Sequence, residues 1–384
     1  MVIPKTFSSW LVMTSLLRAS TSTADKVAYT DHTVTSIKAL QTWYYEEEGL
    51  WNTTGWWNSA NCLTVLGDYG VLDHDGFIDL DLEDVLAITF TQAPQASQAT
   101  NKMLMRSQSY HLIESHYTKS SRSGGSYMDS RGYSGFLNSF YDDEGWWALA
   151  WIRAYDVTNK TDYLNVAESI FADMQGGVNG TCGGGIWWSK DRTYKNAIAN
   201  ELYLAVAASL ANRVSKANSY LEIAKNQWSW FKKSGMINND NLINDGLTIS
   251  ANGTCTNNGE TEWSYNQGVI LGGLVELYRA TGDPGLLSTA STIASAAISA
   301  LSKDGILHDS CVFMRNLHYL QLEAPRDEFR TFILGNADSI WDTDRNSSNY
   351  LGLVWSGPPT AGGDPNAGTH SSAMDTLVAA MAVV

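Results

Sequence analysis

The sequence predicts an all-α fold, an (α/α)6 barrel in which six inner helices are wrapped by an outer ring. Segments that are apolar on nearly every side alternate with segments that are apolar on one side, as buried and surface helices do. Helical pairs also repeat at a hairpin-sized period of roughly 60 residues, marked by Leu164, Leu221 and Leu287. An open superhelical array of helical hairpins fits this period too. It accounts less well for five or six helices that are apolar all round, so the closed barrel is favoured.

The helices are recognised in chain order from their apolar stripes and from the residues that separate them. Segment 142–155 leaves no solvent face, whereas the next segment has a single stripe through Leu164 and Phe171. Asp283 and Pro284 supply a cap and a first-turn proline. Period-two alternation appears only in short loops. Helices are therefore expected at residues 34–48, from 55, 82–116, 142–155, from 162, 195–213, around 219–231, 263–280, from 283, 308–322, 327–341 and 366–384.

Length and charge limit the classes of partner. The chain has 384 residues, which on length alone could form one large domain or two to three ordinary ones, and its apolar content of 44% is ample for a sizeable core. Because the helices are expected to form one barrel, we expect a single domain over residues 25–384, and we expect a monomer. Its formal net charge is −15 and it has no basic run, so nucleic acid and anionic membrane surfaces are poor partners. A neutral polymer would not be repelled. No stretch beyond the N-terminus is expected to span a membrane, and the apolar residues 376–384 are expected to be the last turns of a buried helix and not a lipid-anchor signal.

The first 24 residues resemble a secretion signal. Lys5 provides a short basic region, residues 10–17 an apolar core, and Ser22-Thr23-Ala24 a cleavage site of small residues. We therefore expect a secreted, extracellular protein, and association with a cell wall is compatible with this location. Five N-glycosylation sequons agree with this location. They begin at Asn52, Asn159, Asn179, Asn252 and Asn346.

Four cysteines allow three pairings. Cys182 and Cys255 both lie in Asn-Gly-Thr-Cys loops, and we predict a disulfide between them. Cys62 falls in an apolar helical run and is predicted to be a buried thiol. No Cys-x-x-Cys or His-x-x-x-His pattern is present, so neither a metal site nor a cofactor is expected.

Polar residues gather near the N-terminal ends of the proposed inner helices. In a barrel of this kind the inner helices run parallel, so these groups are expected to converge on one rim. A polar rim above an apolar barrel is a binding cleft. The groups are Asn58 and Asn61; Asp142 and Asp143; Asn196, Asn200 and Glu201; Tyr265, Asn266 and Gln267; and His370, Ser371 and Ser372.

The pair Asp142-Asp143 is the candidate catalytic centre. Glycosidases commonly use two carboxyl groups, about 5–5.5 Å apart in retaining enzymes and about 6.5–9.5 Å apart in inverting ones. Adjacent residues have Cα atoms about 3.80 Å apart and reach the shorter separation more easily. The alternative is that Asp142-Asp143-Glu144 merely forms the acidic first turn of a helix. We do not expect Glu144 to be catalytic.

Aromatic rings offer flat faces for stacking on sugars. Trp187 and Trp188, in a glycine-flanked loop, are the favoured platform, with Trp56-Trp57 and Trp146-Trp147 as further candidates. Core packing is the alternative for most of these rings. We expect it for the tryptophans that lie on helical stripes, namely Trp151, Trp228 and Trp230. Asp245 in Asn244-Asp245-Gly246 either holds sugar hydroxyls or makes a turn.

The segment Tyr-Asp-Asp-Glu-Gly-Trp-Trp-Ala-Leu-Ala-Trp at 141–151 resembles the signature of glycoside hydrolase family 76, the endo-α-1,6-mannanases of fungi and bacteria. Three further blocks at 54–61, 184–188 and 261–268 agree in the family's order, and the similarity spans residues 40 to about 375. The resemblance implies an (α/α)6 barrel and retaining hydrolysis of α-1,6-mannan or manno-oligosaccharides. It also implies Asp142 as nucleophile and Asp143 as acid/base. The substrate is then expected to contact Asn58, Trp187, Trp188, Asn196, Asp245, Tyr265 and Gln267.

One feature departs from the family pattern. Members carry a longer loop with a second cysteine before the penultimate inner helix, whereas residues 305–313 run straight into it. Cys311 is then without its usual partner and one cleft wall is shortened. Two alternatives to a mannanase therefore stay open. One is a wall-remodelling transglycosylase, although the Asp-Asp-Glu-Gly-Trp-Trp sequence follows the mannanase pattern. The other is an inactive mannan-binding homologue.

Overall fold

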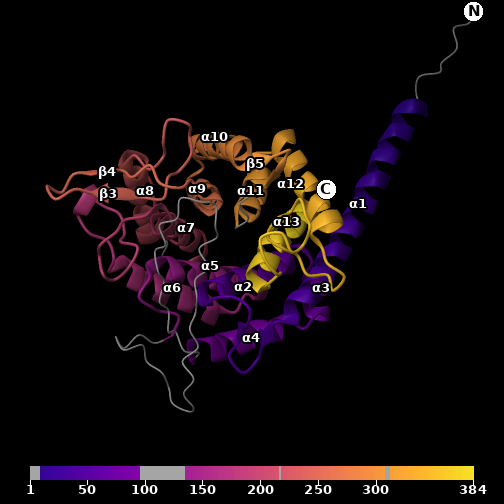
Figure 1. The fold of residues 1–384 in the computed structure, drawn as a ribbon, viewed down its shortest axis with the longest axis horizontal. Coiled ribbons are helices and arrows are strands. Elements are labelled where there is room, and N and C mark those ends of the chain that lie inside the picture. The colour runs from indigo at the N-terminus through magenta and orange to yellow at the C-terminus, as the bar shows by residue number, and fades with distance from the viewer. Residues whose placement is uncertain (1–8, 96–134, 216–217, 308–311) are drawn as a thin grey trace, which may run out of the picture.

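The computed structural model describes residues 9–95, 135–215, 218–307 and 312–384, and in this part of the chain helices form two concentric rings (Figure 1). The inner ring contains α2 (Trp56–Leu72), α5 (Tyr141–Thr158), α7 (Ala197–Arg213), α9 (Ser264–Thr281), α11 (Phe313–Glu323) and α13 (Ala367–Val383). The outer ring contains α1 (Ser9–Gln41), α4 (Leu82–Gln92), α6 (Thr161–Gln175), α8 (Asn218–Ser234), α10 (Pro284–Leu301) and α12 (Asp327–Ser339). A short helix, α3 (His74–Asp79), joins α2 to α4.

The inner ring is closed. Each inner helix packs against the next one in chain order, and α13 returns to pack against α2. The outer helices α6, α8, α10 and α12 each pack on the inner helix that precedes them, while α1 packs on α13. Closure of the ring confirms the (α/α)6 barrel and excludes the open superhelix.

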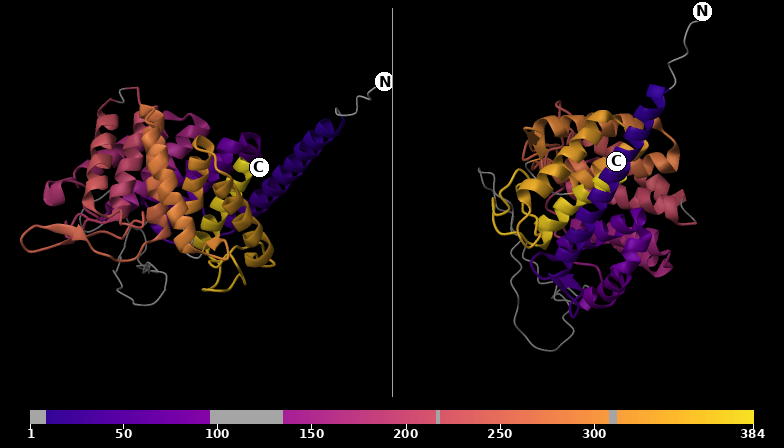
Figure 2. Two further views of the ribbon diagram at one scale, coloured as in Figure 1. Left: turned by 90° about the horizontal axis from the view of Figure 1, so that it is seen from above. Right: turned by 90° about the vertical axis from the view of Figure 1, so that its right-hand side faces the viewer.

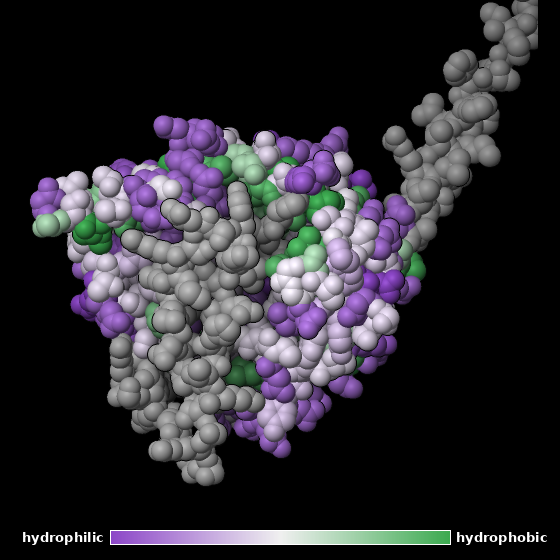
Figure 3. All heavy atoms as spheres, viewed as in Figure 1, coloured by the Kyte–Doolittle hydropathy of each residue, from purple (hydrophilic) through white to green (hydrophobic). Residues whose placement is uncertain are grey.

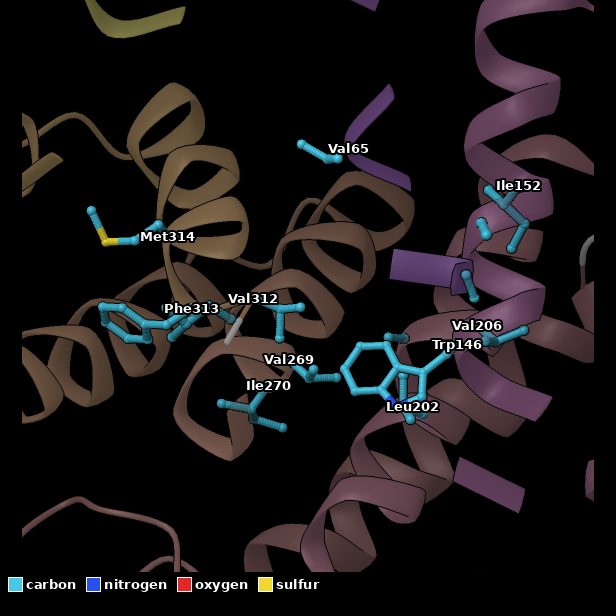
Figure 4. Packing of buried hydrophobic residues seen from close by; sticks show 14 of the residues in the cluster. Val65, Trp146, Ile152, Leu202, Val206, Val269, Ile270, Val312, Phe313 and Met314 are labelled. Carbon is cyan, nitrogen blue, oxygen red and sulfur yellow. The ribbon is translucent and has the colours of Figure 1, made fainter. Parts of the chain in front are cut away.

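Inner helices are apolar all round because every side of them meets another helix. In α7, each residue from Ala197 to Leu210 is buried. Gly145 lets α5 approach α7 closely, since a side chain there would lie within 2.7 Å of the Leu202 Cβ atom. Trp146 extends from α5 toward Val269 of α9 in the interior (Figure 4). The doubly apolar sequence pattern is thus the direct consequence of enclosure.

The residues at helix ends agree with the sequence patterns. The Asp283 side chain accepts a hydrogen bond from the Gly285 amide, and Pro284 opens α10, as predicted. α5 ends at Thr158 and is capped by Asn159, which has the left-handed conformation with φ of 56°. Within the described residues, α10 also has the length and apolar composition of a membrane span, yet it packs against α9. The absence of a membrane span stays a prediction.

Strand structure is confined to short pairs. β1 (Tyr44–Tyr45) pairs with β2 (Leu50–Trp51), β3 (Leu247–Ile249) with β4 (Cys255–Asn257), and β5 (Ser302–Lys303) with β6 (Ile306–Leu307), all antiparallel. The first pair corrects the expected helix at 34–48. That helix ends at Gln41, because two aromatic residues that favour strands are followed by a turn at Gly49, where φ is +65°.

Two other predicted helices also differ in extent. α4 ends at Gln92, just before Pro94, whose nitrogen cannot donate to the preceding turn, and the three-residue 3-10 helix η1 (Ala93–Gln95) follows. The rest of the predicted segment 82–116 lies outside the described residues. Residues 308–311, which include Cys311, also lie outside the described residues. The shortened loop therefore stays an expectation. α12 ends at Ser339 and passes into a π-helical turn, η3 (Ile340–Asp344).

A network of ion pairs links all six inner helices. Asp68 of α2 pairs with Arg153 of α5 at 2.7 Å, and Arg213 of α7 pairs with Asp156 of α5 at 2.7 Å and with Glu276 of α9 at 2.9 Å. The network continues to α11 and α13 through two pairs. These are Arg279 with Glu323 at 2.8 Å and Arg315 with Asp375 at 2.9 Å. Asp68, Arg315 and Asp375 are the buried members of the network, and there a single unpaired charge would be costly.

Loops on one side of the barrel gather around its mouth. Figure 2 shows the β3–β4 hairpin and the loop that follows η3 on the same side of the helices. In the space-filling view of Figure 3 the described surface is mostly hydrophilic or intermediate in hydropathy, with small hydrophobic areas. This is the side to which the N-terminal ends of the inner helices point, as predicted from their polar residues.

The predicted disulfide joins Cys182 to Cys255, and Cys62 is a buried free thiol, as predicted. We expect the double variant Cys182→Ala/Cys255→Ala to lose about 2–4 kcal/mol of unfolding free energy, because the link spans a sequence separation of 73 residues. Denaturant unfolding measures this difference. Reducing agent should lower the stability of the wild type toward that of the variant and leave the variant unchanged. A wild type whose stability is insensitive to reduction would contradict the prediction.

Candidate active site

The candidate site lies at the first turn of α5. Asp142 is 6% exposed and its neighbours Asp143 and Glu144 are fully buried, so three consecutive carboxyl groups are enclosed at the mouth of the barrel. Burial of this kind is costly unless each group has polar partners. The positive end of the α5 dipole at this turn offsets part of that cost.

Asp143 is held by Asn138, which lies in the loop that leads into α5. The Asn138 side-chain nitrogen donates to Asp143 Oδ2 at 2.7 Å, and its side-chain oxygen accepts from the Phe140 amide at 2.8 Å. The amide of Asn138 cannot turn over without losing the second bond, so it must present an N–H group to the aspartate. Asn138 is 1% exposed, and water therefore has little access to this contact.

Glu144 takes part in an ion pair. Its Oε1 accepts from the Asn138 backbone amide at 3.1 Å and from Lys190 Nζ at 2.7 Å. Lys190 also lies 2.7 Å from Asp173 of α6. Burial raises the pKa of Glu144 well above its usual range, and the Lys190 charge opposes this shift. The carboxyl group therefore holds the backbone of the loop that carries Asn138.

The tryptophan loop is joined to the start of α5 by backbone hydrogen bonds. The Tyr141 amide donates to the Trp188 carbonyl at 2.9 Å, and the Lys190 amide donates to the Ser139 carbonyl at 3.0 Å. Trp188 is half-buried and its ring centroid lies 5.0 Å from that of Phe140. Trp187 is only 6% exposed, so its ring packs inside the loop. Of the two predicted platform rings, Trp188 is the one with an accessible surface.

Asp245 belongs to the same site. It accepts a short hydrogen bond from the Tyr194 hydroxyl, and its carbonyl accepts from the Ala197 amide at the start of α7. Burial raises the pKa of Asp245, and the charges of Glu260 and Asp142 raise it further, against hydrogen bonds from Tyr194 and Trp263. Asp245 is therefore close enough to Asp142 for their charges to interact. The two loops and the α5 turn bring together carboxyl groups that are distant in sequence.

The structure uses Gln267 differently from the prediction. Its side-chain oxygen accepts from the Ile243 amide at 2.8 Å, and its nitrogen donates to the Ile243 and Trp263 carbonyls at 2.9 and 3.0 Å. Gln267 is fully buried and both donor hydrogens are used. It therefore supports the loop that carries Asp245, and direct substrate binding by its side chain is not supported.

The other predicted rim residues differ in their burial and in the groups they contact. Asn196 caps α7 by accepting from the Ala199 amide at 3.3 Å. Asn58 is half-buried at the start of α2, and Tyr265 is half-buried with its ring stacked on Trp263 at 5.9 Å. His370 faces the outer ring, since Nδ1 accepts from the Leu351 amide and Nε2 lies 2.8 Å from the Ser36 carbonyl oxygen. Contacts of Asn58, Asn196 and Tyr265 with substrate remain predictions.

Sequence reasoning missed three polar residues of the site, namely Asn138, Lys190 and Tyr194. Each lies within a few residues of a predicted site residue, but in a loop whose backbone course follows no period. No group of three or more His, Cys, Asp or Glu side chains among the described residues is arranged as a metal site. The site brings together buried carboxyl groups and aromatic rings.

Comparison with known proteins places this barrel and its acidic turn in one family. The family model of Glycosyl hydrolase family 76 matches residues 20–383. The chain belongs to glycosyl hydrolase family 76. Among curated relatives, the mannan endo-1,6-alpha-mannosidase DFG5 of Saccharomyces cerevisiae is 32% identical over 185 residues, covering 44% of this chain and 40% of the relative. DCW1 of the same yeast, with the same activity in its name, is 29% identical over 224 residues, covering 55% and 49%. The matched segments span less than half of each of these relatives.

Solved structures of the family share the fold. An inactive variant of a family 76 α-1,6-mannanase from Salegentibacter, with two consecutive aspartates replaced and α-1,6-mannotriose bound, has a TM-score of 0.75 at 20% identity. It is covered over its whole length by 93% of this chain. Dfg5 from Chaetomium thermophilum, in complex with glucosamine, gives a TM-score of 0.71 at 17% identity, covering 91% of this chain and 89% of Dfg5. At these identities the likeness shows the barrel fold.

Proposed function

We propose that the protein is a retaining endo-α-1,6-mannanase that cleaves internal bonds of mannan. The observation that carries the proposal is the buried Asp142-Asp143 pair at the first turn of an inner helix of a family 76 barrel. Replacement of two consecutive aspartates marks the inactive Salegentibacter variant, which binds α-1,6-mannotriose. The fungal relatives that match this chain carry the same activity in their names.

Two adjacent carboxyl groups suit a double displacement. In the first step Asp142 attacks the anomeric carbon and forms a covalent mannosyl ester, while Asp143 gives its proton to the departing glycosidic oxygen. In the second step water attacks the same carbon, Asp143 takes a proton from the water, and the ester bond to Asp142 breaks. The mannose is released with its original α configuration. Asn138 keeps Asp143 in place through both steps.

Two further residues are assigned to the substrate. Trp188 is half-exposed beside the start of α5, and we place a mannose ring against its face. Asp245 is close to Asp142 and is held by Tyr194, which suits a carboxylate that accepts hydrogen bonds from sugar hydroxyls. A neutral polymer such as mannan meets no electrostatic barrier from a chain with net charge −15.

Digestion of linear α-1,6-mannan tests the proposal. We expect release of oligosaccharides of mixed length, with the α-anomer appearing first in NMR spectra recorded during the reaction. Products longer than an added acceptor would favour a wall-remodelling transglycosylase. Binding to mannan without turnover, unchanged by Asp142→Asn or Asp143→Asn, would favour an inactive mannan-binding homologue. Early release of the β-anomer would contradict the retaining mechanism.

We also propose that the protein is secreted and acts outside the cell, as its first 24 residues suggest. The Cys182–Cys255 disulfide favours an oxidising compartment. Among the predicted glycan sites, Asn52, Asn159 and Asn252 are exposed, while Asn179 and Asn346 are partly buried. Recovery of the protein from the medium, with a new N-terminus after Ala24 and a mass reduced by peptide N-glycosidase, would support this location. Retention inside the cell with Met1 intact would contradict it.

Asn138 offers a specific prediction about proton donation. Asn138→Asp keeps the size of the side chain but replaces the N–H group facing Asp143 by an oxygen. We expect kcat on mannan to fall by about 10- to 100-fold, part of the 10²–10⁴-fold that general acid catalysis supplies. A 2,4-dinitrophenyl glycoside of an α-1,6-manno-oligosaccharide needs little acid assistance, so formation of the ester from it should fall much less.

Asn336→Asp is the matched control, because Asn336 is a buried asparagine of outer helix α12 that binds the Leu307 amide and the Gly305 carbonyl. It should affect both substrates equally. If Asn138→Asp lowered the rates on both substrates by the same factor, Asn138 would have only a structural role.

A further inference from the structure

Lys195 is a fully buried lysine whose ammonium group lies in a ring of backbone carbonyls. Its Nζ lies 2.5 Å from the Gly184 oxygen, 2.8 Å from that of Thr181, 2.9 Å from that of Gly185 and 3.4 Å from that of Asn179. An ammonium group has three donor hydrogens, so these four acceptors satisfy it completely. The geometry is that of a cation held by peptide oxygens.

Two indole rings complete the surroundings of this group. The Nζ atom lies 4.8 Å from the centroid of Trp187 and 5.9 Å from that of Trp230, both within the range of cation–π attraction. No carboxylate in the described part of the chain forms an ion pair with Lys195. Burial lowers the pKa of Lys195 to about 8, so the amine is charged in neutral and mildly acidic solution. A buried charge without a counter-ion is uncommon and must be stabilised by the oxygens around it.

The carbonyls belong to a loop, 179–185, that is anchored at Cys182 by the disulfide to Cys255 and by a hydrogen bond from the Trp230 indole to the Cys182 carbonyl. The Lys195 ammonium group is the contact that links carbonyls on both sides of this anchor, from Asn179 to Gly185. The backbone of the loop is glycine-rich, and Gly184 and Gly185 have φ of +144° and +78°. A side chain at Gly185 would collide with the Trp230 ring, so this stretch cannot be stiffened by larger residues. The loop continues directly into Trp187 and Trp188 and from there into the pairing with the start of α5.

We propose that Lys195 is a positioning residue, an internal cation that orders loop 179–185 and so fixes the tryptophan loop against which the sugar binds. The effect on sugar binding rests on the proposed function, whereas the ordering of the loop does not. Lys195 contacts neither Asp142 nor Asp143 through any of these bonds. Its loss should therefore weaken substrate binding more than it slows the chemical step.

The test compares Lys195→Met, which keeps the length of the chain without its charge, with Lys232→Met. Lys232 is an exposed lysine of α8 whose Nζ lies 5.2 Å from the Trp228 ring centroid but in no ring of carbonyls, so it controls for loss of a lysine–tryptophan contact. For Lys195→Met we expect amide hydrogen exchange in residues 179–188 to accelerate at least tenfold, with exchange in α5 and α7 unchanged. We expect KM for mannan to rise about fivefold or more while kcat stays within about twofold. Lys232→Met should change neither quantity.

Chemical rescue provides a second arm. Lys195→Ala leaves room for the missing three carbons and the ammonium group, so millimolar propylammonium should restore slow exchange in residues 179–188 by occupying the carbonyl ring. Uncharged butane derivatives should not restore slow exchange in these residues. In the wild type, NMR of the lysine ammonium groups should show a slowly exchanging NH3⁺ signal at pH 6 that is absent from Lys195→Met and present in Lys232→Met.

The outcomes separate the two proposals. Unchanged hydrogen exchange in Lys195→Met, or the absence of a slowly exchanging ammonium signal in the wild type, would overturn the role of Lys195. A fall in kcat as large as the rise in KM would show that Lys195 supports the catalytic turn as a whole. That result would overturn its specific role in the tryptophan loop. If the wild type did not cleave mannan, the proposed function would fail, while hydrogen exchange and rescue by propylammonium would still decide the role of Lys195.

Discussion

Asp142→Asn and Asp143→Asn are each expected to lower kcat/KM on α-1,6-mannan by about 10³-fold or more, because one removes the nucleophile and the other the proton donor. The two losses should differ with the leaving group. Asp143→Asn should still form the mannosyl ester from a 2,4-dinitrophenyl manno-oligosaccharide, since dinitrophenolate departs without a proton. Asp142→Asn should be inactive on both substrates. Steady-state rates and the burst of dinitrophenolate measure this contrast.

Azide tests the same assignment by stereochemistry. In Asp143→Ala, azide attacks the mannosyl ester in place of water and should yield the α-mannosyl azide. In Asp142→Ala, azide enters the space left by the carboxylate, displaces dinitrophenolate directly and should yield the β-mannosyl azide. Unfolding curves should match that of the wild type closely enough to exclude misfolding. Reversed configurations would exchange the two roles, and full activity of either asparagine variant would refute the mechanism.

The barrel could be predicted because enclosure leaves its signature in composition. An inner helix such as α7 has no solvent side, and the sequence shows this directly as an unbroken apolar segment. The boundaries of the helices were harder to predict. The helix expected at 34–48 ends at Gln41 because Tyr44 and Tyr45 pair with a neighbouring strand, a contact that depends on the turn at Gly49.

The site could be predicted in part. The position of a polar residue along the axis of an inner helix can be predicted from the sequence. The direction in which its side chain projects from that axis cannot. Tyr265 and Gln267 lie two residues apart, so their side chains diverge by about 200° and cannot both face the cleft. Gln267 indeed faces the Asp245 loop. His370 likewise lies near its helix start and yet bonds to the outer helix α1.

Residues that act through loops could not be found in this way. Asn138 reaches Asp143 from the loop before α5, where its side chain also accepts from the Phe140 amide. Lys195 reaches its carbonyl ring because the glycines at 184 and 185 pack closely on the Trp230 ring. Neither arrangement follows a helical or strand period. The disulfide could be predicted for a different reason. Both cysteines lie in the same four-residue sequence, in two loops that the barrel brings together.

Arg315→Met is expected to cost about 3–5 kcal/mol of unfolding free energy, because it breaks a buried ion pair. Arg315 is buried in the interior, where it pairs with Asp375 at 2.9 Å and donates to the Asn61 side chain at 2.8 Å. Asp68 lies 3.6 Å from it but keeps Arg153 as a partner. Burial raises the pKa of Asp375 to about 7 even beside Arg315, so removal of the guanidinium leaves this carboxyl group without its counter-charge and the Asn61 side-chain oxygen without its donor. Denaturant unfolding at pH 7 measures the loss.

The double variant Arg315→Met/Asp375→Leu decides whether the cost comes from the stranded charge or from lost packing. If the charge dominates, removal of both partners should recover most of the stability lost by Arg315→Met, because a buried pair replaced by apolar residues is often close to neutral. The interaction energy from the double-mutant cycle should then exceed about 2 kcal/mol. Additive losses would mean that the Arg315 side chain stabilises the barrel mainly by filling space between α2, α11 and α13. A single variant within about 1 kcal/mol of the wild type would show that Asp375 is protonated in the folded protein and needs no counter-charge.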